Sequence, residues 1–191
     1  MTDAASPKPA SRLGGLAVYG ERRGFIMLLL GVSAGLPNLL IFDTLSAWLR
    51  ESGLSLEVIG FFALATLSYS LKFVWAPLID RTAIPGLTRL LGHRRAWMLV
   101  TQGVIIAGLW AISGLNPANA LVQVAVFATL VGFFGATQDI VIDAWRIEAA
   151  DDSRHGAMAA AYQMGYRVAM IVAGAVPLVL AAIVVMQMFK E

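Results

Sequence analysis

The chain lacks cysteine altogether and holds only two histidines in 191 residues. Disulfide bonds and thiolate metal sites are therefore excluded. His93 and His155 are too few for the clustered sites of zinc or di-iron membrane enzymes. No glycine-rich phosphate loop and no Ser/His/Asp arrangement is present either, so the sequence predicts neither an enzyme nor a bound cofactor or metal.

Charge is also scarce, because Asp, Glu, Lys and Arg make up 14% of the chain while 59% of it is hydrophobic. An average soluble domain is about one-quarter charged. The basic residues gather in short segments between apolar stretches, which argues against a nucleic-acid-binding surface. This pattern is typical of a membrane protein that crosses the bilayer several times.

A helix needs about 20 mainly apolar residues to cross the hydrocarbon core. Five segments approach or exceed this length, and the turn sequence NPAN at 116–119 separates the third from the fourth. We therefore predict an all-α, polytopic membrane helix bundle, preceded by a disordered cytoplasmic tail at residues 1–23. The transmembrane part, residues 24–191, is predicted to have spans at 24–49, 57–79, 96–115, 119–145 and 156–185.

The distribution of Lys and Arg predicts the orientation of these spans. Loops 50–56 and 116–118 contain a single basic residue, Arg50. The tail and the 80–95 loop together contain eight, which are Lys8, Arg12, Arg22, Arg23, Arg81, Arg89, Arg94 and Arg95. Because basic loops stay in the cytoplasm, the N-terminus is predicted to be cytoplasmic.

Five ionisable residues lie within the predicted spans: Asp43, Lys72, Asp139, Asp143 and Arg167. A charge near the bilayer centre costs at least ~2.5–3.5 kcal/mol, so such residues usually face a bundle interior or a water-filled pathway. Span 96–115 contains no charge, whereas each of the other four spans contains at least one. We expect those four helices to line a polar interior.

Chain distance from the loops gives an estimate of depth. Asp139 lies 14 residues before Ser153 and Arg167 lies 14 residues after it, so an antiparallel hairpin would place both at similar depth. Their opposite charges could compensate each other there. Asp139 and Asp143 share one helix face, because they are four residues apart.

Several roles remain open for these charges. Asp143 and Arg146 form either a structural ion pair or part of a pathway. Lys72 either reaches the level of Asp139 or extends toward the interface. Asp43 is a candidate mouth residue facing water, and Asp139 with Arg167 is favoured for the transport pathway.

The sequence contains an internal repeat with a spacing of 97 residues. A shift of 97 residues superposes Gly35 on Gly132 and AW at 47–48 on AW at 144–145. Asp43 then falls within one position of Asp139, and Lys72 within two of Arg167. The first two spans thus resemble the fourth and fifth, as in the nested three-helix repeats of transporters. Gly31 and Gly35 also form a GxxxG pair, for which close helix packing is the main explanation.

Two sets of motifs carry a family resemblance. Asp80 and Arg81 closing the second span, with Gly92, Arg94 and Arg95 before the third, resemble the cytoplasmic loop signature of the major facilitator superfamily. A more specific similarity, to the AmpG-type muropeptide permeases and their acetyl-CoA transporter relatives, is carried by GVSAGLP at 31–37, IGFF at 59–62, KFVWAPLIDR at 72–81, QDIVIDAW at 138–145 and GYR at 165–167. Ala76 and a long loop depart from the superfamily pattern, in which a glycine stands four residues before the aspartate.

The resemblance implies a function. The family imports N-acetylglucosaminyl-anhydro-N-acetylmuramyl peptides across the bacterial inner membrane with proton coupling, for cell-wall recycling. By resemblance, Asp139 is the candidate proton-coupling carboxylate and Arg167 its partner or a contact for substrate anions. The partners implied are the lipid bilayer, protons and a small-molecule substrate.

The family folds with at least twelve helices in two halves, whereas five are predicted here. The expectation is therefore a fragment of a longer protein, a truncated gene product, or a half-unit that needs a second half in the same or another chain. Two alternatives to muropeptide import remain: a facilitator for another solute, such as a sugar or an acyl-CoA, and a non-transporting membrane protein.

Overall fold

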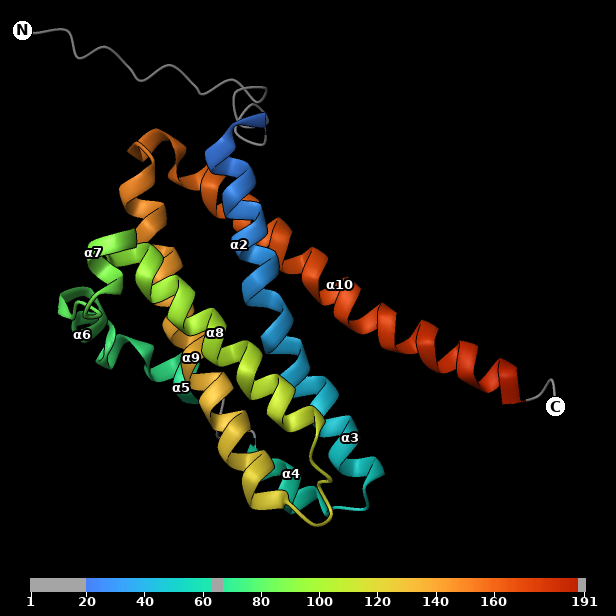
Figure 1. The fold of residues 1–191 in the computed structure, drawn as a ribbon. Coiled ribbons are helices and arrows are strands. Elements are labelled where there is room, and N and C mark those ends of the chain that lie inside the picture. Colours follow the sequence, from blue (N-terminus) through green and yellow to red (C-terminus); the bar gives the residue numbers. More distant parts are fainter. Residues whose placement is uncertain (1–19, 63–66, 189–191) are drawn as a thin grey trace, which may run out of the picture.

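The computed structural model describes residues 20–62 and 67–188, and every regular element in these two ranges is helical. This confirms the prediction of an all-α bundle (Figure 1). The α-helices are α2 (Arg22–Leu39), α3 (Leu45–Glu51), α4 (Leu56–Phe62), α5 (Leu67–Leu71), α6 (Ala76–Arg81), α7 (Leu87–Leu91), α8 (His93–Ser113), α9 (Leu121–Ala149) and α10 (His155–Met188). The shorter elements are the π-helix η1 (Leu40–Thr44) and the 3₁₀-helices η3 (Lys72–Val74) and η4 (Asp152–Arg154).

Three stretches of the described residues are long and apolar enough to cross a membrane, namely Arg22–Glu51, His93–Ser113 and Leu121–Ala149. They coincide with the predicted first, third and fourth spans to within four residues at each end. The predicted fifth span, 156–185, lies inside α10, which has 34 residues. The chain is thus a multi-pass membrane bundle, and the count of five spans remains a prediction.

The first long stretch begins earlier than predicted and is interrupted by a π-helical segment. Glu21 is the N-cap of α2, so Arg22 and Arg23 belong to the helix and not to the predicted tail. The remainder of that tail, residues 1–19, lies outside the described residues. Pro37 has no backbone N–H to donate, and the π-helix η1 begins three residues after it. Such π-turns are rare and often occur at functional sites.

The predicted second span, 57–79, is divided among short elements in the described part of the chain: α4, α5, η3 and α6, with residues 63–66 outside it. Pro77 occupies the first turn of α6, where its missing donor costs nothing, and the 3₁₀ turn η3 leads into it. The predicted loop at 80–95 contains the short helix α7. Gly86 and Gly92 bound that helix with φ of 78° and 82°, which favours glycine at both positions.

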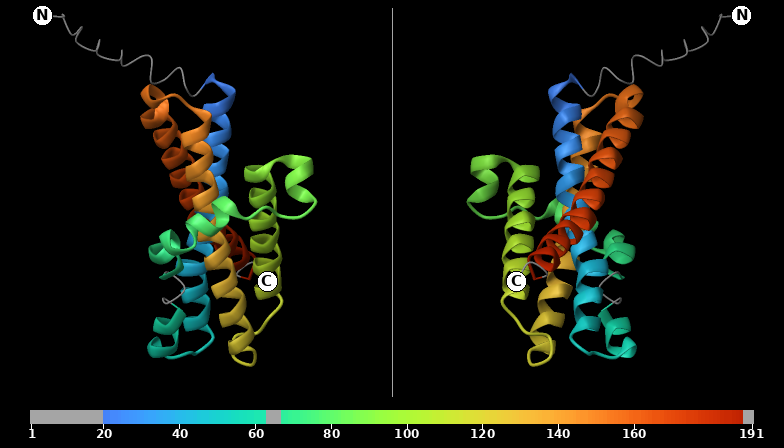
Figure 2. Two further views of the ribbon diagram at one scale, coloured as in Figure 1. Left: turned by 90° about the vertical axis from the view of Figure 1, so that its left-hand side faces the viewer. Right: turned by 90° about the vertical axis from the view of Figure 1, so that its right-hand side faces the viewer.

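Two long helix pairs organise the bundle. α2 packs along α10, and α8 packs along α9; α9 also contacts α2. Figure 1 shows the C-terminal part of α10 diverging from the other helices, and Figure 2 shows the bundle from two sides. α9 is therefore the central helix, with neighbours along most of its length.

Glycines permit the close approach of α2 and α10. A Cβ atom on Gly31 would overlap the carbonyl oxygen of Tyr162, and one on Gly165 would overlap the carbonyl oxygen of Leu28. A Cβ on Gly35 would meet Ala169 and Tyr166. These contacts confirm that Gly31 and Gly35 serve helix packing, as expected for small residues in membrane interfaces.

Candidate functional site

A carboxylate in the middle of α9 is the centre of the candidate site. The Asp139 side chain is 17% exposed. Its Oδ2 lies 3.8 Å from Lys72 Nζ, and its Oδ1 accepts a hydrogen bond of 2.9 Å from the Tyr162 hydroxyl. Segments from three parts of the chain, η3, α9 and α10, thus converge on one carboxylate.

The break in the predicted second span presents Lys72 to α9. Lys72 opens the 3₁₀-helix η3, and two contacts of the neighbouring Trp75 hold this segment against α9. Trp75 Nε1 donates to Thr137 Oγ1 at 3.2 Å, and the Trp75 ring lies 4.8 Å from that of Phe133 between centroids. Of the two roles open for Lys72, the structure has it at the level of Asp139.

Asp143 lies one helical turn beyond Asp139 on the same face of α9. Its Oδ2 is 3.6 Å from Lys72 Nζ and its Oδ1 is 3.1 Å from Arg146 Nη2. The predicted ion pair of Asp143 with Arg146 is therefore present. Lys72 stands between two carboxylates and is close to both, so it can pair with either.

The other two predicted residues do not join this cluster. Arg167 is exposed on α10 and makes no ion pair with a described residue, so Lys72 and not Arg167 is the cation beside Asp139. Tyr162 faces Asp139. Arg167 follows five positions later on the same α-helix, so its side chain is rotated by about 140° from the direction of Tyr162. Asp43 is exposed in η1, and none of the described residues forms an ion pair with it.

Sequence reasoning missed Tyr162. A signal was available, because Ala161, Gly165 and Ala169 form a buried small-residue stripe that marks the face of α10 turned toward the bundle. Tyr162 is adjacent to that stripe. A hydroxyl beside it is therefore placed to reach the polar interior.

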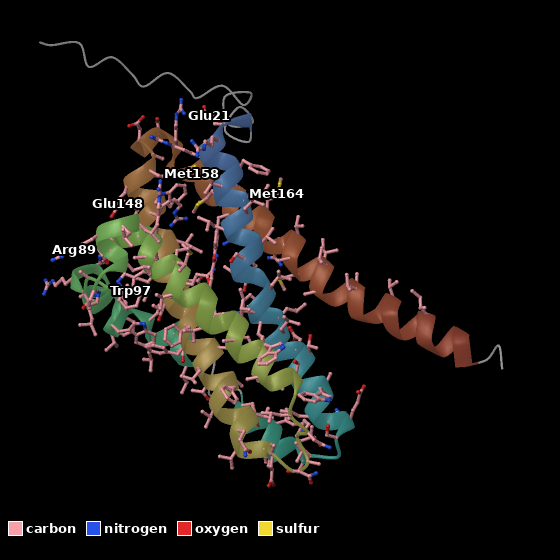
Figure 3. The ribbon with its side chains drawn as sticks, in the orientation of Figure 1. Glu21, Arg89, Trp97, Glu148, Met158 and Met164 are labelled. Atoms are coloured by element: carbon pink, nitrogen blue, oxygen red, sulfur yellow. The ribbon has the colours of Figure 1, made fainter. Side chains whose placement is uncertain are left out.

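A second ion cluster lies at the end of the bundle where α2, α8 and α10 begin, which we call the basic end. Arg94 Nη1 is 2.5 Å from Asp80 Oδ1, and its Nε and Nη2 lie 3.0 and 2.6 Å from Glu148 Oε1. Figure 3 labels Glu148 near this end. Arg94 thus joins α6, α8 and α9, and we call this group the Arg94 latch.

The remaining residues of the loop signature have different roles. Gly92 is the N-cap of α8 in a conformation that favours glycine. Arg81 and Arg95 are exposed, and neither pairs with an acidic group among the described residues. His93 Nε2 contacts the carbonyl oxygen of Ile79 at 3.0 Å, which further ties α8 to α6.

Two more contacts connect the termini of helices at the basic end. Arg23 Nη1 donates to the carbonyl oxygen of Ala149 at 2.5 Å, and Arg154 Nη1 lies 2.6 Å from Glu21 Oε2. In Figure 3 Glu21 lies at the same end as Glu148. Together with the Arg94 latch, they fix the ends of α2, α9 and α10 relative to one another.

The arrangement at Asp139 suits proton exchange more than covalent chemistry. The carboxylate is largely shielded from solvent, its cation is shared with Asp143, and no nucleophile–base pair accompanies it in the described part of the chain. The described residues contain no group of three His, Cys, Asp or Glu side chains that would hold a metal ion.

Known proteins resemble this chain over most of its length. "Putative transporter AmpG 4" of Rickettsia felis is 40% identical over 166 residues, which are 87% of this chain and 40% of that protein. "Anhydromuropeptide permease" of Escherichia coli K12 is 39% identical over 166 residues, 87% of this chain and 33% of that protein. An uncharacterized protein of Haemophilus influenzae is 40% identical over 162 residues, 85% of this chain and 37% of that protein.

The chain therefore spans between one-third and two-fifths of the length of these relatives. The relatives that carry a functional name are named as transporters or permeases, not enzymes. The family described as "Acetyl-coenzyme A transporter 1" matches residues 24–190, nearly the whole membrane bundle. The chain belongs to this transporter family of the major facilitator type, and the AmpG-like permeases are similar to the chain over most of its length.

Proposed function

We propose that the chain is the N-terminal portion of a proton-coupled importer of anhydro-muropeptides in the bacterial inner membrane. The observation that carries this proposal is the shared cation at Asp139: Lys72 Nζ lies 3.8 Å from Asp139 and 3.6 Å from Asp143. The relatives named as AmpG transporters and as an anhydromuropeptide permease support the substrate class.

The proposed coupling uses Lys72 as a cation that changes partner. When Asp139 is ionised, Lys72 compensates its charge. When Asp139 takes a proton, Lys72 pairs with Asp143 alone, so neither protonation state leaves an unpaired ammonium in the membrane. Tyr162 donates to the ionised form of Asp139 and holds the carboxylate in place.

Arg167 and Asp43 are proposed to contact the pathway and not the coupling cluster. Arg167 is exposed on α10, where a substrate anion is a suitable partner for a guanidinium. Asp43 lies on the exposed side of η1 and is proposed as a mouth residue. The complete site is proposed to need a second half, because transporters of this type bind substrate between repeats.

The proposed orientation places the N-terminus and the basic end in the cytoplasm. Arg94 of the latch and Arg154 of the Arg154–Glu21 pair both lie at that end. This follows the positive-inside distribution of Lys and Arg.

Uptake of a labelled anhydro-muropeptide by the full-length gene product in proteoliposomes tests the proposal. With an inward proton gradient the wild type should accumulate substrate, and Asp139→Asn should abolish accumulation while substrate exchange persists. Glu57→Gln, an exposed carboxylate outside the cluster, is the control and should accumulate substrate normally. Accumulation by Asp139→Asn would overturn the coupling role.

A second candidate substrate is acetyl-CoA, because the matching family is described as an acetyl-coenzyme A transporter. Competition in the same vesicles separates the two. Unlabelled anhydro-muropeptide should inhibit uptake and acetyl-CoA should not. Inhibition by acetyl-CoA and not by anhydro-muropeptide would identify acetyl-CoA as the substrate and leave the proposed proton coupling intact. Uptake of neither compound would favour a non-transporting protein.

A further inference from the structure

The short helix α7 at the basic end has an outer surface that the described helices leave uncovered. α7 connects α6 to α8, and α8 is its main contact in the bundle. Figure 2 shows α7, in green, on the side of α8 that faces away from the other helices. The outer surface of α7 is therefore open to whatever surrounds the protein at this level.

The length of α8 places α7 at the boundary of the membrane. α8 has 21 residues, which cover about 31 Å at 1.5 Å per residue, close to the ~30 Å of the hydrocarbon core. α7 ends at Leu91, two residues before α8 begins. Trp97, in the second turn of α8, donates from Nε1 to the carbonyl oxygen of Thr82 at 2.8 Å. Because tryptophan is enriched at membrane–water interfaces, this contact also places the segment at the level of the lipid headgroups.

The outer surface of α7 combines an apolar and a basic side chain. Leu90 is 81% exposed, and its neighbours Arg89 and Leu91 are exposed as well. Leu87 and Thr88 are only half-exposed, so they form the side of α7 that is turned toward the protein. Figure 3 labels Arg89 at the outer edge of the molecule. A leucine in this position can enter the acyl region while the arginine beside it stays among the headgroups.

The charge of this segment has one sign. Residues 81–95 contain four arginines and no Asp or Glu. Arg94 is engaged in the latch, whereas Arg81 and Arg89 are exposed and pair with no acidic group among the described residues. Guanidinium groups bind phosphate oxygens well, and an anionic headgroup has no ammonium of its own to compete for its phosphate. The segment is thus complementary in charge to anionic lipid.

The backbone around α7 is held in place by the protein itself. Gly86 and Gly92 bound the helix with φ of 78° and 82°. The backbone N–H of Ile84 donates to Thr88 Oγ1 at 2.8 Å, which ties the preceding turn to the helix. Because the surface is formed in advance, a lipid that binds there does not bear the cost of ordering it.

We propose that α7 binds anionic phospholipid at the membrane surface, with the lipid phosphate at Arg89 and Arg81 and with Leu90 among the acyl chains. The apolar side chain at the centre of this surface favours a lipid over a free phosphate ion. The inference concerns the lipid around the protein and goes beyond the proposed transport of a solute.

Fluorescence quenching by brominated lipids tests the proposal in the full-length gene product, reconstituted into phosphatidylcholine vesicles. Leu90→Cys, in a cysteine-free background, carries a bimane label. An equal minor fraction of brominated phosphatidylglycerol or brominated phosphatidylcholine is then included. The anionic lipid should quench the label several-fold more strongly. Trp110→Cys, at an 80% exposed position near the other end of α8, is the matched control and should be quenched equally by both lipids.

The charge at position 89 should control this preference. Arg89→Gln should lower it about fivefold, as expected for the loss of one arginine near an anionic surface, and Arg89→Lys should keep most of it. Equal quenching by both lipids with Arg89 in place would overturn the proposal, because Leu90 would then meet lipid without selecting its charge. Absence of quenching by either lipid would also overturn it, since α7 would then lie in water or under protein.

Thermal unfolding of the unlabelled protein gives a second measurement that does not need the cysteine. Adding phosphatidylglycerol to phosphatidylcholine vesicles should raise the midpoint temperature of unfolding. Arg89→Gln should lose most of this increase, whereas Arg50→Gln, which changes an exposed arginine at the opposite end of the bundle, should keep it. An increase of the same size in Arg89→Gln as in the wild type would contradict the proposed lipid site.

Discussion

Two ion clusters lie along α9 and share one design, a cation between two carboxylates. At the centre, Lys72 stands 3.8 and 3.6 Å from Asp139 and Asp143. At the basic end, Arg94 stands 2.5 and 2.6 Å from Asp80 and Glu148. The clusters differ in distance and in the chemistry of the cation.

These differences suit the two clusters to different roles, a change of protonation state in one and a permanent link between helices in the other. The planar guanidinium of Arg94 directs several donors at fixed angles, which suits a permanent link between helices. The ammonium of Lys72 is a point charge on a flexible stem, so it can shift between carboxylates at little geometric cost. The central cluster is therefore suited to a change of protonation and the Arg94 latch to holding helix ends.

Removal of the central cation should have the largest effect on stability. Lys72→Gln leaves Asp139 without a cation at membrane depth, and we expect a loss of about 3 kcal/mol in the free energy of unfolding. Adding Asp139→Asn to this variant should restore a large part of the loss, because it removes the unpaired charge. Unfolding titrations of the purified protein in detergent measure both. A double variant no more stable than Lys72→Gln would contradict the pairing.

Removal of Arg94 from the latch should lower the free energy of unfolding by less than removal of Lys72. Arg94→Gln removes charged hydrogen bonds to partners that are partly exposed, so we expect a loss of about 1.5 kcal/mol. Arg94→Lys keeps the charge but not the planar set of guanidinium donors, so it should retain only part of the stability that Arg94→Gln loses. The same titrations apply. Full recovery by lysine would show that charge alone holds the latch.

Salt should distinguish the clusters further. Raising ionic strength from about 0.15 to 1 M shortens the screening length from ~8 to ~3 Å for solvent-exposed charges. The stability loss in Arg94→Gln should therefore shrink at high salt, while the loss in Lys72→Gln stays nearly constant. Equal salt dependence of both losses would mean that the central cluster is as exposed to water as the Arg94 latch.

The smallest effect is expected at the Arg154–Glu21 pair. Both side chains are about half exposed, at 51% and 42%, although the distance is only 2.6 Å. Exposed pairs of this kind contribute about 0.2–1 kcal/mol, so Arg154→Ala should lie at the low end of that range. A loss as large as that of Arg94→Gln would indicate that this pair is a second latch.

The sequence predicted the long helices well, because hydropathy over 20 residues reports directly on membrane burial. It did not predict the division of the second span, since the backbone effects of Pro77 are local while hydropathy averages over them. The short helix α7 was missed in the predicted 80–95 loop for a related reason: its five residues are too few to show a period.

For the candidate site, sequence reasoning predicted Arg167 as the partner of Asp139, whereas Lys72 and Tyr162 are its partners in the structure. Counting residues from a loop places Asp139 and Arg167 at one level, but it says nothing about the direction in which each side chain points. The packing of α10 on α2 through Gly31 and Gly165 sets that direction, turning Tyr162 toward Asp139. Glu148 of the latch was missed because its contact with Arg94 depends on how the ends of α8 and α9 meet.

The central claim, that Asp139 is the group that exchanges the coupled proton, is tested most directly by proton movement during substrate uptake. Proteoliposomes of the full-length gene product, with a pH-sensitive dye inside, should acidify when the wild type is given substrate without an imposed gradient. Asp139→Asn should exchange substrate across the membrane with no acidification. Substrate-driven acidification that persists in Asp139→Asn would contradict the account.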